Sequence, residues 1–193
     1  MTEARPHQRR VTISDPQVMR ALAHPARMAI MEHLGTLEGG ATATECAEIA
    51  GLSPSATSYH LRELAKFGLV RQAPGRGDAR ERVWQAVNPS YQFEVGPDAD
   101  PEARAAEAAL VEAHLVRDAQ RVRDWLRRAR DEPQEWYEAT WFSDSMLLVT
   151  AEELAELNQA VQALMEPYRR RNRTDPPAGV RPVAAQYRAM PID

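Results

Sequence analysis

Cysteine and long apolar segments are what this 193-residue sequence has least of. Its one cysteine, Cys46, cannot form a disulfide within the chain, which fits a reducing compartment. No segment approaches the roughly 20 consecutive apolar residues that a membrane-spanning helix needs. The basic residues 1–10 are followed by no apolar stretch, so we expect no secretory signal. These absences predict a cytoplasmic protein with no membrane partner.

An excess of positive charge is also missing, because the net charge of the chain is −4. The charges are unevenly distributed, however. Residues 1–90 contain 11 Lys and Arg against 9 Asp and Glu, whereas residues 91–193 contain 13 against 19. The first part therefore carries the positive charge that could meet phosphates, although many domains that bind no nucleic acid carry as much.

Proline and glycine gather in three places and predict breaks in the chain there: residues 74–77, 89–101 and 176–182. Residues 1–14 contain several arginines and little apolar content, which predicts a flexible basic arm. Asp15 then caps a helix that begins at Pro16. A second helix begins at Pro25 and has apolar residues at helical spacing: Met28, Ile30, Met31 and Leu34.

Two short helices joined by a tight turn are expected next. Thr42 and Glu45 have the spacing of a capping box and begin a helix that runs to about Ala50. Gly51 ends this helix, and Ser53 caps the following one. Two helices joined by a three-residue turn that contains glycine are a helix-turn-helix.

A β-hairpin is expected after this motif. Residues 69–73 and 81–87 are strand-like, and the residues between them are rich in glycine and polar side chains. Such a hairpin is a wing, so that residues 15–90 are predicted to fold as a winged helix-turn-helix DNA-binding domain.

Two segments resemble the ArsR family of transcription regulators. The segment from Ala21 to Leu34, ALAHPARMAIMEHL, resembles the opening signature of the family. The segment from Leu52 to Leu64, LSPSATSYHLREL, followed by Gly68-Leu69-Val70, resembles its second signature in the right order and spacing. The resemblance implies a dimeric regulator whose second motif helix enters the major groove of DNA.

The helix after Ser53 is expected to have a core face and a DNA-reading face. Thr57, Leu61 and Leu64 recur at steps of four and three and should face the core. The opposite face carries hydroxyls, an aromatic ring and two cations, which suit base edges and phosphates: Ser55, Ser58, Tyr59, Arg62 and Lys66. Arg62 is the first candidate for a base contact. His60 borders the core face, and packing fits it as well as a phosphate contact.

The wing tip carries Arg76 and Arg80 among glycine and polar residues. We expect both to follow the DNA backbone or the minor groove, where the potential is strongly negative. A solvated hairpin tip is the alternative.

Metal sensing, which is common among ArsR-type proteins, has little support in these residues. One family site uses clustered cysteines on the first motif helix, where only Cys46 is present and a role as a small hydrophobic residue fits it. A second site type would begin at Glu112 and His114. Its downstream positions hold Trp125 and Arg128, which cannot ligate a metal. We expect no metal and no cofactor.

Residues 101–193 are expected to begin with a long helix from Pro101 to about Arg130. One apolar stripe follows it at steps of three and four: Ala105, Ala108, Val111, Leu115, Ala119, Val122, Leu126 and Ala129. So long an amphipathic helix predicts packing on its counterpart in a homodimer. Burial of the stripe within one chain is the alternative.

A small α+β appendage is predicted after this helix. Residues 135–142 are rich in aromatics and strand-prone, and residues 183–189 alternate as a late strand would. Between them, Thr150 and Glu153 form a second capping box ahead of a helix. The predicted fold class is mainly α with small β: a winged helix-turn-helix, a long dimerisation helix and the α+β appendage.

Aromatic residues in the predicted first strand suggest an effector site. Trp136, Tyr137 and Trp141 could line a pocket for a small, largely apolar molecule that changes the spacing of the two recognition helices. The alternative is that these rings build a small core.

The sequence as a whole predicts a sequence-specific DNA-binding transcriptional regulator, which binds double-stranded DNA as a homodimer. A repressor is favoured, and an activator is the alternative. The alternative to a regulator is an enzyme, for example a methyltransferase, that uses the winged helix only for dimerisation. No G-x-G-x-x-G follows a strand, and no nucleophile with a base and an orienting residue is recognisable. We therefore expect no enzymatic activity.

Overall fold

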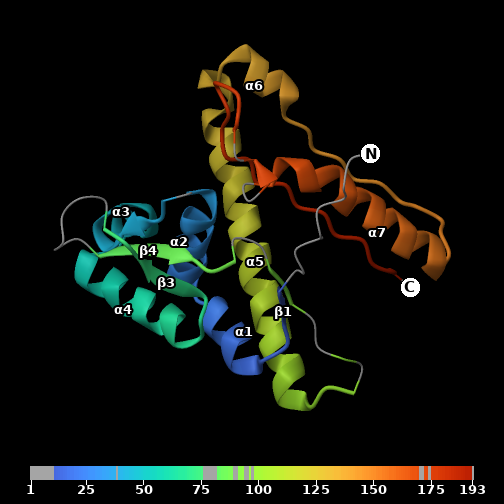
Figure 1. Ribbon diagram of the computed structural model, residues 1–193. Helices are drawn as coiled ribbons and strands as arrows, with labels where there is room; N and C mark the ends of the chain where they lie inside the picture. Colours follow the sequence, from blue (N-terminus) through green and yellow to red (C-terminus); the bar gives the residue numbers. More distant parts are fainter. Residues whose placement is uncertain are drawn as a thin grey trace, which may run out of the picture. The chain divides into compact units, whose positions relative to one another are not determined.

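The computed structural model describes residues 11–37, 39–75, 82–88, 91–93, 96, 98–169, 172–173 and 175–192 (Figure 1). The chain divides into two compact units, Met1–Val116 and Arg117–Asp193. The division falls inside one continuous helix, α5 (Pro101–Arg128). Among the described residues, no helix combines the length and the apolar character that crossing a membrane requires.

The first two helices begin at the residues that the sequence predicts. Helix α1 (Pro16–Leu22) is capped by Asp15, whose carboxylate accepts a hydrogen bond from the backbone N–H of Gln17 at 2.8 Å. Helix α2 (Pro25–Thr36) is capped by His24, whose Nδ1 accepts from the N–H of Ala26 at 3.2 Å. In both helices proline stands at the first turn, where its missing N–H costs nothing.

The helix-turn-helix consists of α3 (Ala43–Ala50) and α4 (Pro54–Lys66). Both hydrogen bonds of the capping box between Thr42 and Glu45 are present at the start of α3. Gly51 ends α3 in the left-handed conformation with φ +64°. The hydroxyl of Ser53 then accepts from the N–H of Ala56 and caps α4. The sequence prediction of this motif is confirmed.

The wing is part of a three-stranded antiparallel sheet with the strand order β2-β4-β3. Its strands are β2 (Ala41–Thr42), β4 (Val83–Ala86) and β3 (Val70–Ala73). The register pairs Val70 with Ala86 and Ala73 with Val83. Both predicted wing strands are thereby confirmed, and residues 76–81 of the tip lie outside the described residues.

A second pair of strands corrects the prediction of a flexible arm over residues 1–14. Strand β1 (Val11–Ile13) pairs in parallel with β5 (Tyr91–Phe93), and Ile13 is buried in the core. The β-branched residues of β1 favour an extended strand, and burying Ile13 adds apolar contact. Residues 1–10 lie outside the described residues, so the arm stays a prediction for them.

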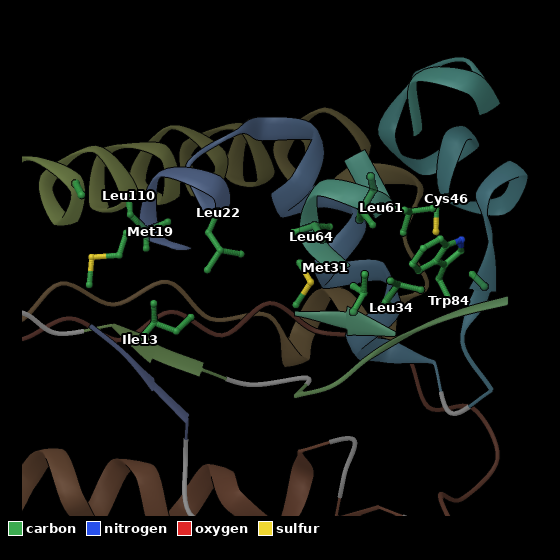
Figure 2. Close-up of a cluster of buried hydrophobic side chains, with 14 residues drawn as sticks. Ile13, Met19, Leu22, Met31, Leu34, Cys46, Leu61, Leu64, Trp84 and Leu110 are labelled. Carbon is green, nitrogen blue, oxygen red and sulfur yellow. The ribbon is translucent and has the colours of Figure 1, made fainter. Parts of the chain in front are cut away.

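One apolar core joins the elements of the first unit (Figure 2). Its largest members come from α1, α2, α4 and α5: Met19, Leu22, Ile30, Leu34, Leu61, Leu64 and Leu110. Helix α5 contributes Ala106 and Leu110 to this core, and Ala103, three residues before Ala106, is also buried. Cys46 is also fully buried, and burial raises the pKa of its thiol to about 11, as suits a small hydrophobic residue.

The second unit contains helices and extended segments. After the end of α5 come a short 3-10 turn (Ala129–Asp131), helix α6 (Gln134–Ala139) and helix α7 (Ala151–Met165), which leads into another 3-10 turn (Glu166–Tyr168). The capping box of Thr150 and Glu153 at the start of α7 is confirmed.

Both strands predicted for the appendage are wrong. Helix α6 replaces the first, and a hydrogen bond of 2.7 Å between Gln134 and Glu138 on successive turns supports it. The late strand is absent from the described residues 183–189, which are extended but unpaired. The aromatic residues suggested strands, but a strand needs a neighbouring strand to hydrogen-bond with, and no described segment pairs with these residues.

Gly40 provides a test of how closely β2 and β4 approach. A Cβ added at Gly40, where φ is +72°, would lie 2.2 Å from the carbonyl oxygen of Trp84. Because the neighbour is backbone, Gly40→Ala should lower the free energy of unfolding by about 2–4 kcal/mol, measured by urea denaturation. Gly51→Ala is the matched control, since its φ is also positive but no atom lies within 4 Å, and it should cost about 1 kcal/mol. Equal losses in the two variants would contradict the close approach.

Candidate nucleic-acid interface

Helix α4 is fixed in rotation by three buried side chains. Thr57, Leu61 and Leu64 are fully buried in the core, as their spacing predicts. The opposite face is open to solvent: Ser55, Tyr59, Arg62 and Lys66 are exposed, and Ser58 is half-buried. The structure therefore brings five of the predicted DNA-binding residues together on one face of one helix.

The two cations of this face differ in their surroundings. The ammonium of Lys66 lies 2.5 Å from the Glu63 carboxylate one turn earlier, and this hydrogen bond lowers the pKa of Glu63. Arg62 makes no ion pair within the described part of the chain. Arg62 can therefore turn its whole guanidinium to a ligand, whereas Lys66 would first have to leave Glu63.

His60 packs against the start of α2. Its ring centroid lies 4.7 Å from that of His24 and 5.5 Å from that of Tyr59. Burial, reinforced by the neighbouring His24 and Arg27, lowers the pKa of His60, so the ring is uncharged at neutral pH. Its Nδ1 is buried and has no hydrogen-bond partner among the described residues. Of the two roles expected for His60, packing fits this environment better than a phosphate contact.

Two residues lie beside His60: Arg27 and His24. The sequence analysis did not predict either of them as part of this site. Arg27 donates from Nε to the backbone carbonyl of Ala21 and lowers the pKa of His24, where burial is the larger cause. The sequence held a signal for Arg27. A positive charge in the first turn of a helix interacts unfavourably with the helix dipole, so its presence there indicates a specific contact. The close approach of His24 and His60 had no signal in the sequence.

On the wing, Arg71 of β3 is exposed and donates to the side chain of Gln85 across the hairpin at 3.3 Å. Sequence reasoning missed Arg71, although strand alternation after the buried Val70 places it on the outside. Arg76 and Arg80 lie outside the described residues. Their contact with DNA therefore stays a prediction.

The three aromatic residues predicted for an effector site do not form one enclosed wall. Tyr137 is 57% exposed and Trp141 is 84% exposed. Trp136 is half-buried beneath the guanidinium of Arg181, 4.8 Å from its ring centroid. Helix α6 replaces the strand alternation on which the expected pocket depended.

His114, which the sequence offered as a metal ligand, is engaged by its own helix. Nδ1 of His114 lies 3.0 Å from the carbonyl oxygen of Leu110, one turn earlier on α5. Within the described residues, no three His, Cys, Asp or Glu side chains are grouped as a metal site would require.

The histidine pair makes stability depend on pH. Both pKa values are lowered in the folded protein, so the unfolded chain takes up protons first as the pH falls below about 6.5, and stability is lost from there downward. His24→Asn keeps a capping side chain but removes one titrating ring. We expect the decrease in melting temperature between pH 7 and pH 5, followed by circular dichroism, to become smaller in this variant. His33→Asn, in the last turn of α2, is the control, and an unchanged profile in His24→Asn would contradict the role of the pair.

Residues 22–73, from the end of α1 to the end of β3, match the family described as a helix-turn-helix domain. No curated protein matches the chain.

Several solved structures of transcription regulators match part of the chain. A MarR family transcription regulator is 16% identical, with 79% of this chain and 76% of that chain covered and a TM-score of 0.33. ZitR of Lactococcus lactis, as an apo double mutant, is 16% identical, with 76% and 83% covered and a TM-score of 0.33. A MarR family protein of Mycobacterium tuberculosis in complex with salicylic acid is 18% identical, with 78% and 87% covered and a TM-score of 0.29.

These identities and TM-scores are too low to assign the chain to one regulator family. They leave the ArsR resemblance a hypothesis. The match over residues 22–73 and the fold agree on the coarser statement: the chain contains a winged helix-turn-helix domain.

Proposed function

We propose that this protein is a sequence-specific DNA-binding transcriptional regulator that acts in the cytoplasm as a homodimer. The observation that carries the proposal is the exposed face of α4, where hydroxyls, Tyr59 and Arg62 stand opposite a fully buried apolar face. A solvated helix face is usually rich in paired Glu and Lys. Here, by contrast, donors suited to base edges and phosphates predominate.

Arg62 is the proposed base-reading residue. A guanidinium can donate two hydrogen bonds to O6 and N7 of guanine, and Arg62 forms no hydrogen bond or ion pair with a described residue that would compete. Ser55, Ser58 and Tyr59 would contact bases or phosphates beside it. Arg71 on the wing adds a cation for the DNA backbone, together with the predicted Arg76 and Arg80.

The homodimer is proposed from α5. This helix buries Ala103, Ala106 and Leu110, and helical periodicity places the predicted stripe on nearly the opposite side. The stripe is open in one chain: Val111 is 37%, Leu115 41% and Leu126 63% exposed. These exposures favour a second chain over burial of the stripe within one chain, and a second copy of α5 is the proposed cover.

Repression is the mode of action that we propose, on the resemblance to ArsR-type repressors. Neither an effector nor an enzymatic activity is part of the proposal. Tyr137 and Trp141 are too exposed to enclose a small molecule within one chain. An enzyme would need a domain that encloses its substrate, and no apolar residue is buried among the described residues of the second unit.

The first test of this function is Arg62→Ala. On an operator selected from random duplexes, the variant should bind about 1–3 kcal/mol more weakly in fluorescence anisotropy and should lose preference at one base position. Arg123→Ala, which removes an exposed cation of α5, is the control and should bind as the parent does. Equal binding by Arg62→Ala and the parent on every sequence would refute the base-reading role.

The second test is Leu115→Asp. The parent should be a dimer at micromolar concentration in analytical ultracentrifugation, and its footprint should cover two half-sites about one helical turn apart or a multiple of this. Because Leu115 is 41% exposed in one chain, aspartate should leave the fold intact but separate the dimer by burying a charge in its seam. Ala109→Asp, also exposed on α5 but away from the stripe, should remain dimeric. A monomeric parent that protects a single half-site would overturn the dimer.

A further inference from the structure

The first turn of α2 lies against one side of α4. His24, the N-cap residue of α2, contacts His60 of α4, and their ring centroids are 4.7 Å apart. Arg27 follows His24 by one turn, and Glu63 follows His60 by one turn, so each lies on the same side of its helix as the neighbouring ring. We call these four residues the α2–α4 corner.

Positive charge is in excess at the α2–α4 corner. The Glu63 carboxylate accepts a hydrogen bond from Lys66, which is the largest cause of its lowered pKa. The charges of Arg27 and Arg62 lower the same pKa further. Three cations from two helices therefore surround one carboxylate, although the chain as a whole carries a net charge of −4. Such a concentration of one sign of charge attracts an anion.

Arg27 is held in place by one of its nitrogen atoms and keeps the others available. Its Nε donates to the backbone carbonyl of Ala21 in the last turn of α1. Its Nη groups, which hold most of the N–H donors of a guanidinium, form no hydrogen bond or ion pair with a described residue. The side chain is half-buried, so an anion that reaches the Nη groups meets a cation that is already oriented.

The histidines show that the positive potential of Arg27 extends across the corner. Burial is the largest cause of the lowered pKa of both His24 and His60, and the charge of Arg27 lowers both values further. Negative charge bound beside Arg27 would oppose that effect. Because both rings are uncharged at neutral pH, Arg27 supplies the charge that an anion would meet on α2.

The α2–α4 corner borders the DNA-reading face of α4. Helical periodicity places His60 and Glu63 on the flank between the buried Leu61 and Leu64 and the exposed Tyr59. An α-helix with its side chains is about 10–12 Å across and the major groove is about 12 Å wide, so a helix in the groove brings its flanks to the sugar-phosphate backbones. A cation that α2 places beside this flank is therefore in reach of a phosphate.

We propose that Arg27 binds a backbone phosphate at the edge of the groove that α4 reads and thereby positions Arg62 over its base. The inference rests on the proposed DNA-binding function and adds to it a contact that carries no sequence information. A guanidinium matches the oxygens of a phosphate with two parallel hydrogen bonds. Phosphate contacts of this kind determine the register and orientation of a protein on the duplex, whereas base contacts select the sequence.

The test compares Arg27→Gln with Arg27→Lys. In fluorescence anisotropy, Arg27→Gln should bind both the selected operator and an unrelated duplex about tenfold more weakly than the parent, because a phosphate contact does not depend on sequence. Its plot of log affinity against log salt concentration should be less steep by about 0.9 for each bound copy of the chain. Arg27→Lys retains the charge and should retain the slope of the parent. Arg20→Gln, which removes an exposed cation of α1 that pairs with Glu102, is the control for general charge and should match the parent.

Operators in which single phosphates are replaced by uncharged methylphosphonates locate the contact. One replacement at the edge of each half-site should weaken the parent and Arg62→Ala by the same factor and leave Arg27→Gln unchanged. Such a result assigns that phosphate to Arg27. If every replacement that weakens the parent weakens Arg27→Gln equally, Arg27 contacts no phosphate and the inference is wrong.

A purely structural role of Arg27 gives a different pattern. If the contact with Ala21 were its whole role, both variants would lose stability and neither would change the salt slope, which would refute the phosphate site. If circular dichroism shows that glutamine prevents folding, Arg27→Lys decides the question, because the loss of the second hydrogen bond should make the methylphosphonate replacement cost this variant less affinity than it costs the parent. An equal cost would then refute the site.

The outcomes separate this inference from the proposed function. If Arg62→Ala loses its base preference while Arg27→Gln retains the affinity and the salt slope of the parent, the DNA-reading function stands and only the phosphate contact is refuted. A parent that binds no duplex would instead overturn the proposed function, and this inference with it.

Discussion

The packing of Ala106 and Leu110 of α5 into the core of the first unit is the contact on which the other features of the chain depend. It makes the start of α5 part of the same core as α1, α2 and α4. Helix α5 is 28 residues long, and only its first three turns contain buried residues. Because one face of α5 is used in this way, the opposite face is left to carry the apolar stripe. Ala106 is buried in this core, so a larger residue there would overpack it.

Packing into the core also determines which side chains α4 presents to solvent. Leu61 and Leu64 have no alternative place in the core, and they fix the helix in rotation, so Arg62 and Tyr59 point outward as a consequence of packing. Thr57 belongs to the buried side although its hydroxyl has no hydrogen-bond partner among the described residues. A buried hydroxyl without a partner costs stability, and nothing in the described contacts offsets that cost.

Local signals in the sequence were sufficient to predict where the helices of the first unit begin. Contacts between residues far apart in the sequence could not be predicted from it. Asp15, Thr42 and Ser53 act on backbone groups two or three residues away, so their spacing alone predicts where helices begin. Strand β1 needs β5, almost 80 residues later, and its three residues carry no sign of that partner. A strand was predicted where residues 134–139 form a helix. Aromatic side chains favour strands only when a neighbouring strand is available. The proximity of His24 and His60 is likewise a property of the folded core and not of either helix.

The buried thiol of Cys46 has a practical consequence for chemistry on this protein. With a pKa of about 11, about one thiol in ten thousand is ionised at pH 7, and the thiolate is the species that reacts with oxidants and alkylating reagents. The native chain should therefore be almost inert to maleimide labelling while it is folded. A cysteine introduced at any solvent-facing position would then be the only rapidly reacting thiol, without removal of Cys46 from the core. Conversely, the rate at which Cys46 itself is labelled would report how often the core around α3 opens.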